Sequence, residues 1–240
     1  MTAIAHEQKL FAGAYLQHSE NFVRLRFEQP RQSLSSAVLN GGSVLAQQFI
    51  NLKVSSEYAL PDEDPADTLQ KFCAANHWPG TTVGMMTAAS MNSLRVRCEH
   101  IDDVPLAILV TTGLGNARRA GDRAEYRQLA CQPQKVGTIN LAICLEAPLR
   151  PEAMVELITV ATEAKAAALQ QAEVISPVSR ALATGTGTDA VALFCSLQSD
   201  QSNPIRFAGK HTLLGERVGC LVIDAIVDSL QFTDSEKREY

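Results

Sequence analysis

The chain has 240 residues, of which 46% are hydrophobic, and its formal net charge is −5. This composition supports one sizeable core, and the acidic balance without a basic stripe argues against nucleic acid as a partner. No apolar run is long enough to cross a bilayer, the opening residues lack the apolar stretch of a signal peptide, and the six cysteines contain no CxxC pair. We therefore expect a reduced, cytoplasmic protein whose cysteines are small core residues.

The first third of the chain is predicted to form strands around one helix. Apolar and charged residues alternate over residues 22–27, which indicates a half-buried strand. The Asn-Gly-Gly sequence at 40–42 lies between two apolar stretches and indicates a hairpin-like turn. Asp67 or Thr68 could cap a helix over residues 69–76.

The middle of the chain is richest in predicted strands. Three apolar stretches are predicted to be strands: 81–89, 94–98 and 104–113. Asp102-Asp103 forms the turn between the last two, so we expect that pair to be antiparallel. A glycine- and arginine-containing loop follows at 114–123, and residues 138–146 are another predicted strand.

Two long helices are predicted near the C-terminus. Pro151 begins a helix over 151–173, because proline suits the first helical turn. Its apolar positions recur at helical spacing and form a stripe: Met154, Leu157, Ile158, Ala161 and Ala168. Lys165 falls within this stripe, so it must be paired, snorkelling or part of a site, whereas Glu163 points away. A second, mostly apolar helix is predicted over 211–231.

The order of these elements predicts the fold class. Strands come in runs with few helices between them, which favours an α+β protein over a doubly wound parallel fold. We expect a single domain with a largely antiparallel or mixed sheet covered by a few helices. Within it, residues 1–35 are an N-terminal strand and variable segment, residues 36–232 form the main body, and residues 233–240 are a frayed tail.

The segment ATGTGTD at 183–189 carries the most unusual polar pattern. Threonines at 184, 186 and 188 alternate with glycines and precede Asp189 and an apolar strand at 190–195. In an extended segment the three hydroxyls would share one face, and the glycines would let a ligand approach the backbone. The alternative is a tight strand entry with polar capping. A phosphate loop is disfavoured, because no lysine follows and a strand comes next.

Other polar residues gather in two further loops. Lys210 and His211 lie at a predicted helix start, where a cation opposes the helix dipole and needs an anionic partner. Asp189 is a candidate partner if the two loops meet; a plain surface pair is the alternative. Residues 111–122 combine threonine, glycine, asparagine and Asp122 directly after a buried strand, where binding groups gather.

Seven of these segments, taken in order, resemble the CbiZ family of adenosylcobinamide amidohydrolases. The matching segments are VLNGG at 38–42, GMMTAA at 84–89, TTGLGNARRAGD at 111–122, TIN at 138–140, ATEAKAAAL at 161–169, ATGTGTD at 183–189 and GKHTLLGE at 209–216. One departure is Thr112, where a smaller residue is expected in much of the family. Each segment alone is a weak signal, but their ordered combination is specific.

The resemblance implies hydrolysis of the amide that joins the corrin propionate arm to aminopropanol in (adenosyl)cobinamide, giving (adenosyl)cobyric acid for cobalamin salvage. The partner is then a corrinoid small molecule, with no nucleic acid and no membrane, and a homo-oligomer stays open. Cobalt arrives inside the substrate, so we expect no cofactor and no metal held by the protein. A corrinoid-binding protein without catalysis is the main alternative, and a nucleotide-dependent transferase is a weaker one.

A mechanism follows as a hypothesis. Asp189 orients His211, which acts as general base and then general acid on an attacking water. Lys165 steadies the oxyanion or pairs with Asp189 or Glu163. The expected substrate-binding residues are Asn40, Gly41, Thr87, Thr111, Asn116, Asn140, Thr184, Thr186, Thr188 and Lys210. A covalent route with one of the threonines at 184, 186 or 188 as nucleophile stays open.

Overall fold

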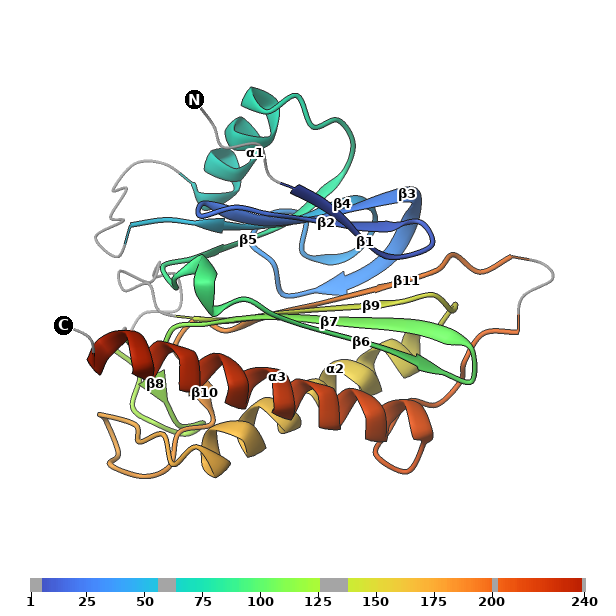
Figure 1. The fold of residues 1–240 in the computed structure, drawn as a ribbon. Helices are drawn as coiled ribbons and strands as arrows, with labels where there is room; N and C mark the ends of the chain where they lie inside the picture. The colour runs from blue at the N-terminus through green and yellow to red at the C-terminus, as the bar shows by residue number, and fades with distance from the viewer. Residues whose placement is uncertain (1–5, 56–63, 126–137, 200–202, 239–240) are drawn as a thin grey trace.

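The computed structural model describes residues 6–55, 64–125, 138–199 and 203–238, without the side chains of residue 6 and of residues 232–238 (Figure 1). The strands are β1 (His6–Phe11), β2 (Ala14–His18), β3 (Phe22–Ser35), β4 (Gly42–Lys53), β5 (Thr82–Thr87), β6 (Arg95–Ile101), β7 (Val104–Thr112), β8 (Ala117–Arg118), β9 (Ile139–Leu145), β10 (Gly185–Thr186) and β11 (Ala190–Cys195). The helices are α1 (Pro65–Ala75), the 3-10 turn η1 (Met91–Ser93), α2 (Pro151–Gln171) and α3 (Leu213–Arg238).

The main sheet folds over on itself and gives two stacked layers. Its strands run in the order β1-β2-β3-β11-β9-β7-β6, with β4 paired to β3 and β5 paired to β4. The 14-residue β3 joins the layers, because its first part pairs with β2 and its last part pairs with β11. Helix α1 covers the outer face of one layer, and α2 and α3 cover the other (Figure 1). The order is therefore helix, sheet, sheet, helices.

Both parallel and antiparallel pairs occur in this sheet. β9 and β11 are parallel, as are β4 and β5, while the other pairs are antiparallel. The predicted mixed sheet of an α+β protein is confirmed. The predicted turn at Asp102-Asp103 is also confirmed: both residues have positive φ, 46° and 67°, as a tight hairpin between antiparallel strands requires.

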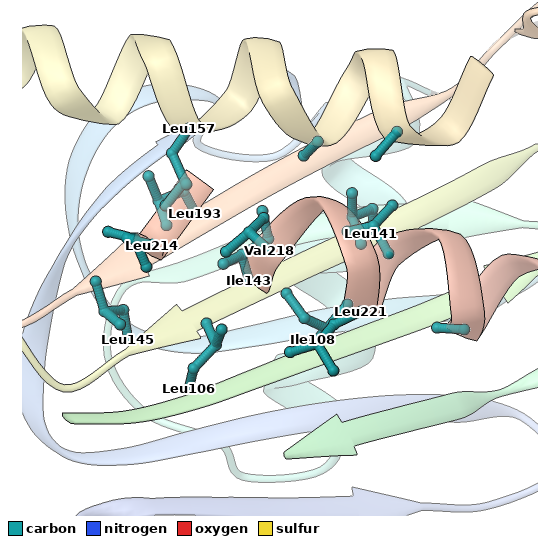
Figure 2. Close-up of a cluster of buried hydrophobic side chains, with 14 of the residues drawn as sticks. Leu106, Ile108, Leu141, Ile143, Leu145, Leu157, Leu193, Leu214, Val218 and Leu221 are labelled. Atoms are coloured by element: carbon teal, nitrogen blue, oxygen red, sulfur yellow. The ribbon is translucent and has the colours of Figure 1, made fainter. Parts of the chain in front are cut away.

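Three apolar clusters fill the spaces between the four layers. The largest lies between helices α2 and α3 and the layer formed by β6, β7, β9 and β11. There, Leu141 and Ile143 of β9 meet Val218 of α3 (Figure 2). A second fills the space between the sheets around Phe49 and Phe194. Each fully buried leucine, isoleucine or phenylalanine contributes about 1.5–3 kcal/mol of transfer free energy. Because both faces of β9 are covered, every residue of INLAICL is buried.

Two helix boundaries differ from the sequence predictions. Helix α1 begins at Pro65 rather than near residue 69, because Asp64 is the actual cap and accepts the Ala66 N–H at 2.8 Å. The last helix, predicted over 211–231, runs further in the structure, since α3 extends from Leu213 to Arg238. The frayed tail at 233–240 stays a prediction. No helix of the described residues is long and apolar enough to span a membrane.

The cysteine prediction holds for three of the five described cysteines. Cys73, Cys144 and Cys195 are buried, whereas Cys98 and Cys220 are exposed. Burial raises the pKa of Cys144 to about 12, and it also raises the pKa of Cys73 and of Cys195. These three thiols stay protonated near neutral pH, which makes them poor nucleophiles. Cys131 lies outside the described residues.

Candidate functional site

The 184–189 segment forms a short strand and a turn, not one extended run. Only Gly185 and Thr186 pair with a strand, the two-residue β8. The chain then turns at 187–188 before β11 begins. The predicted row of three hydroxyls on one face is therefore wrong, because the turn after Thr186 sends the following side chain in a new direction. The capped strand entry is the arrangement observed.

The carboxylate of Asp189 is the centre of this turn. Its Oδ1 accepts the backbone N–H of Ile139 at 3.0 Å and the hydroxyl of Thr186 at 2.5 Å. Its Oδ2 accepts the backbone N–H of Thr186 at 2.9 Å and an ion-paired hydrogen bond from Lys165. A carboxylate has about four acceptor positions, so these four donors fill it. Asp189 is thereby held in one orientation.

Lys165 reaches this carboxylate from the buried face of α2. The Lys165 and Asp189 side chains are only 14% and 12% exposed. The prediction that a lysine in an apolar stripe must be paired is confirmed, and the partner is one of the two acids proposed. Two charges this far from water are stable only as a pair, because removing either one leaves the other without its counter-charge.

Only glycine fits at position 185, beside this ion pair. A Cβ at position 185 would lie 2.2 Å from Asp189 Oδ2 and 2.9 Å from Lys165 Nζ. We expect Gly185→Ala to push the pair apart and to lower kcat at least tenfold. Gly115→Ala is the control, since nothing lies within 4 Å of a Cβ there. Steady-state rates of the two purified variants check this; equal rates would contradict the tight fit.

The loop after β7 packs against the same turn. The Gly187 N–H donates to the Asn116 carbonyl at 3.1 Å, and a Cβ at Gly187 would lie 3.2 Å from Asn116 Nδ2. Asn116 Oδ1 is buried and has no hydrogen-bond partner within the described part of the chain. The structure thus places Asn116 beside the Asp189 turn, and its expected substrate-binding role stays a prediction.

Asp122 ties this loop to the segment that leads into the turn. Its Oδ2 accepts the Arg119 N–H at 2.8 Å and the hydroxyl of Ser176. The Ser176 and Ser179 hydroxyls and the Arg119 N–H lower the pKa of Asp122, in that order of size. Thr184 adds a further brace, because its Oγ1 accepts the Ala120 N–H at 2.8 Å. Thr184 therefore helps to fix the loop, and its expected substrate-binding role stays a prediction.

Asn140 and Thr111 lie behind the site, between the two sheets. Each is 2% exposed. Asn140 Nδ2 donates to Asn51 Oδ1 at 2.7 Å and to the Met86 carbonyl at 2.9 Å, while Asn51 Nδ2 donates to Thr111 Oγ1 at 2.8 Å. The prediction that Asn140 and Thr111 contact the substrate is therefore corrected: both side chains belong to a buried hydrogen-bond network centred on Asn51. The sequence analysis did not predict a role for Asn51, because nothing in residues 50–53, INLK, distinguishes this asparagine from an ordinary strand residue.

Three other expected substrate-binding residues also serve the fold. Thr87 is fully buried at the end of β5. Asn40, with φ of 51°, donates from Nδ2 to the Thr82 carbonyl at 2.8 Å. A Cβ at Gly41 would lie 2.2 Å from the Ala37 carbonyl oxygen, so the turn requires glycine. In the part of the chain that the structure describes, none of the three bonds to the Asp189 carboxylate.

His211 does not reach Asp189. His211 lies beside Gly209, next to Glu156 of α2. Lys165, which pairs with Asp189, is nine residues further along that helix, a distance of about 13 Å. In Figure 1, β10 lies at the left of the molecule and α3, which begins just after His211, starts at the right. His211 is exposed, and its loop is anchored by the Ala208 N–H to Glu156 at 2.7 Å. The predicted Asp189–His211 contact is wrong, since β11 carries the chain away before His211.

Lys210 and Glu163 form an ion pair with each other, not with the Asp189 group. Their side chains are 71% and 49% exposed. The anionic partner that Lys210 was expected to need is therefore Glu163 of α2. Exposed pairs of this kind contribute little to stability, about 0–1 kcal/mol. Lys210 is thus a surface residue, but its partner is Glu163 and not the neighbouring His211.

The comparison with protein families decides the family. Residues 7–238 match the family described as adenosylcobinamide amidohydrolase, CbiZ. The chain belongs to this family. The resemblance drawn from the seven ordered segments is confirmed, and the match extends further, into the N-terminal strands and to the end of α3.

This chain is also similar to two curated proteins, one of which has a name that agrees with the CbiZ assignment. A Methanosarcina mazei protein named adenosylcobinamide amidohydrolase is 27% identical over 202 residues, which cover 82% of this chain and 88% of that one. An uncharacterized Methanocaldococcus jannaschii protein, MJ1613, is 30% identical over 167 residues. The match covers 64% of each of these two chains, so it spans somewhat less than two thirds of the MJ1613 protein.

Solved structures give weaker likenesses to this CbiZ chain. The PH0078 protein from Pyrococcus horikoshii OT3 has a TM-score of 0.48 at 12% identity, covering 96% of this chain and 82% of that one. A Burkholderia sp. beta-aminopeptidase has a TM-score of 0.45 at 10% identity, covering 95% and 87%. Likenesses at these TM-scores carry no argument about the chemistry.

Proposed function

We propose that this protein hydrolyses the amide between the corrin propionate arm and aminopropanol in adenosylcobinamide, giving adenosylcobyric acid and the free amino alcohol. Membership of the CbiZ family supports the substrate. The observation that carries a catalytic role, rather than binding alone, is the part-buried Lys165–Asp189 pair with the Thr186 hydroxyl at 2.5 Å from the carboxylate. A hydroxyl, a carboxylate in hydrogen-bond reach and a cation that orients it meet the requirements for an activated nucleophile.

This geometry favours Thr186 over a water molecule activated by His211. The Thr186 hydroxyl transfers its proton to Asp189 as Oγ1 attacks the amide carbon. The C–N bond then breaks, the same proton passes to the departing amine, and the acyl group stays on Thr186 as an ester. Water hydrolyses that ester, releasing the carboxylic acid and restoring the hydroxyl. Lys165 supplies positive charge beside the developing oxyanion.

The decisive experiment is a hydrolysis assay with the full chain. Adenosylcobinamide is incubated with the purified protein, and mass spectrometry follows adenosylcobyric acid and aminopropanol. We expect both products in equal amounts. Unsubstituted cobinamide and cobalamin, tested in parallel, determine which form of corrinoid is preferred.

Binding without product would contradict the proposal and favour the corrinoid-binding alternative. Equilibrium dialysis with each corrinoid separates these cases. Binding of ATP or GTP with no corrinoid binding would instead favour a nucleotide-dependent transferase.

A further inference from the structure

The space between the two sheets contains a buried polar chain that stability alone does not explain. Asn51 is 3% exposed; its register partner in the same layer is Met85 of β5, and its side chain bonds to Thr111 of β7 and Asn140 of β9 in the other layer. Replacing both partners of a buried hydrogen bond by apolar groups of the same shape is often nearly neutral for stability, so such a bond is not needed for stability alone. A fully satisfied polar network inside an apolar core does, however, set a unique arrangement of the strands around it.

The chain runs from Asn51 to the edge of the Asp189 turn. Asn140 Nδ2 donates to Asn51 Oδ1, and Asn140 Oδ1 then faces the Thr138 hydroxyl at 3.2 Å. Thr138 Oγ1 also lies 2.6 Å from the Thr188 carbonyl oxygen, so its single proton is shared between these two acceptors. Thr188 precedes Asp189 directly, so three side chains connect β4 of one layer to the turn that holds the carboxylate.

The Asn51–Asn140–Thr138 network and the Asp189 group lie on opposite faces of the sheet, at the beginnings of β9 and β11. Asn140 and Ala190 are register partners in β9 and β11, and their side chains face the space between the sheets. Asp189 faces α2 instead, where its carboxylate accepts the Ile139 N–H. Thr138 and Ile139 are adjacent, so moving the Thr138 hydroxyl moves a donor to the carboxylate.

We propose that Asn51 is a positioning residue of the reaction centre, acting through Asn140 and Thr138 to hold the Thr186–Asp189 turn in its reactive geometry. This inference rests on the proposed hydrolysis for its kinetic consequence only. Asn51 touches no substrate; it sets where the carboxylate and the Thr186 hydroxyl lie.

The test combines hydrogen exchange with kinetics. In Asn51→Leu we expect the Ile139 and Thr186 amides, both donors to Asp189, to exchange at least tenfold faster. We also expect kcat to fall at least tenfold while KM stays within threefold. Exchange needs no substrate, so failure of the proposed function leaves this readout intact. Unchanged exchange at both amides would overturn the inference.

The matched control is Gln48→Met on the same strand. Gln48 is also a buried amide, 1% exposed, but its hydrogen bonds go to Arg24 and Thr82 on the α1 side. We expect it to change stability without changing exchange at Ile139 and Thr186. If Gln48→Met speeds exchange there as much as Asn51→Leu does, the effect is general loosening and the inference fails.

A second pair keeps the test decisive if Asn51→Leu does not fold. Thr138→Val removes the hydroxyl at nearly constant shape and should speed exchange at both amides, whereas Thr138→Ser should stay within threefold of the wild type. In the double variant Asn51→Leu/Thr138→Val, the effect of Asn51→Leu should vanish, because its route is already cut. Additive effects, or loss of activity in Thr138→Val without faster exchange, would contradict the route.

Discussion

Replacing Asp189 with asparagine is expected to lower kcat at least a hundredfold and to destabilise the fold. The substitution keeps the shape of the side chain but removes the acceptor for the Thr186 proton, and loss of an acid–base group costs about 10²–10⁴ in rate. It also leaves Lys165, 14% exposed, without its counter-charge. Removing one partner of such a pair costs about 3 kcal/mol of unfolding free energy.

The stability and rate effects of this change can be separated with Lys165→Met. The double variant Asp189→Asn/Lys165→Met should be more stable than Asp189→Asn alone, since no unpaired charge is left, yet it should be no more active. Urea unfolding and steady-state rates measure both. His211→Ala is the control outside the group: we expect turnover within twofold of the wild type, because His211 is exposed and is not among the donors to the Asp189 carboxylate. A hundredfold loss in His211→Ala would restore the histidine mechanism.

Thr186→Val is expected to abolish turnover to the same degree, and Thr186→Ser is expected to keep it within tenfold. Valine matches threonine in shape but lacks the hydroxyl that lies 2.5 Å from Asp189 Oδ1. Serine retains the nucleophile. If Thr186 forms the ester, a rapid acid quench during turnover should show the chain with the mass of the bound corrin acyl group, absent in Thr186→Val.

The opposite outcome has a distinct signature. If Thr186 serves only the turn, Thr186→Val should lower stability through the lost hydrogen bond, by about 1 kcal/mol, and leave kcat nearly unchanged. Thermal unfolding measured beside the rates separates the two roles. A stable Thr186→Val variant with normal turnover would remove the threonine from the mechanism.

Much of the secondary structure could be read from local patterns. The helix over 151–173 and the strand pair around Asp102-Asp103 were predicted within a few residues, because periodicity and turn residues act over short distances. The start of α1 was predicted too late because Pro65 and its cap Asp64 were assigned to an acidic loop. The hairpin β1–β2 was not predicted, since its exposed face reads as a polar segment.

The candidate site also contains residues that were predicted from the sequence and residues that were not. Asp189, Lys165 and Thr186 were predicted from a polar pattern beside a core strand and from one lysine in an apolar stripe, and all three meet. The expected partner His211 does not meet them. Asn51 carried no signal, because a single amide in a buried strand is indistinguishable by pattern from one that simply faces solvent.

By itself, the sequence determined the family resemblance, most of the helices and strands, and the need of Lys165 for a partner, because these depend on residue type and short spacing. The burial of Arg24 and Arg31 was not predicted. Only the tertiary structure decided which groups meet. Lys165 and Asp189 are 24 residues apart and Asn51 and Asn140 are 89 apart, yet each pair is in contact. Asp189 and His211 are 22 residues apart, nearly the same separation as Lys165 and Asp189, yet His211 is not among the donors to the Asp189 carboxylate. Separation along the chain therefore does not decide which groups meet; the stacking of the layers does.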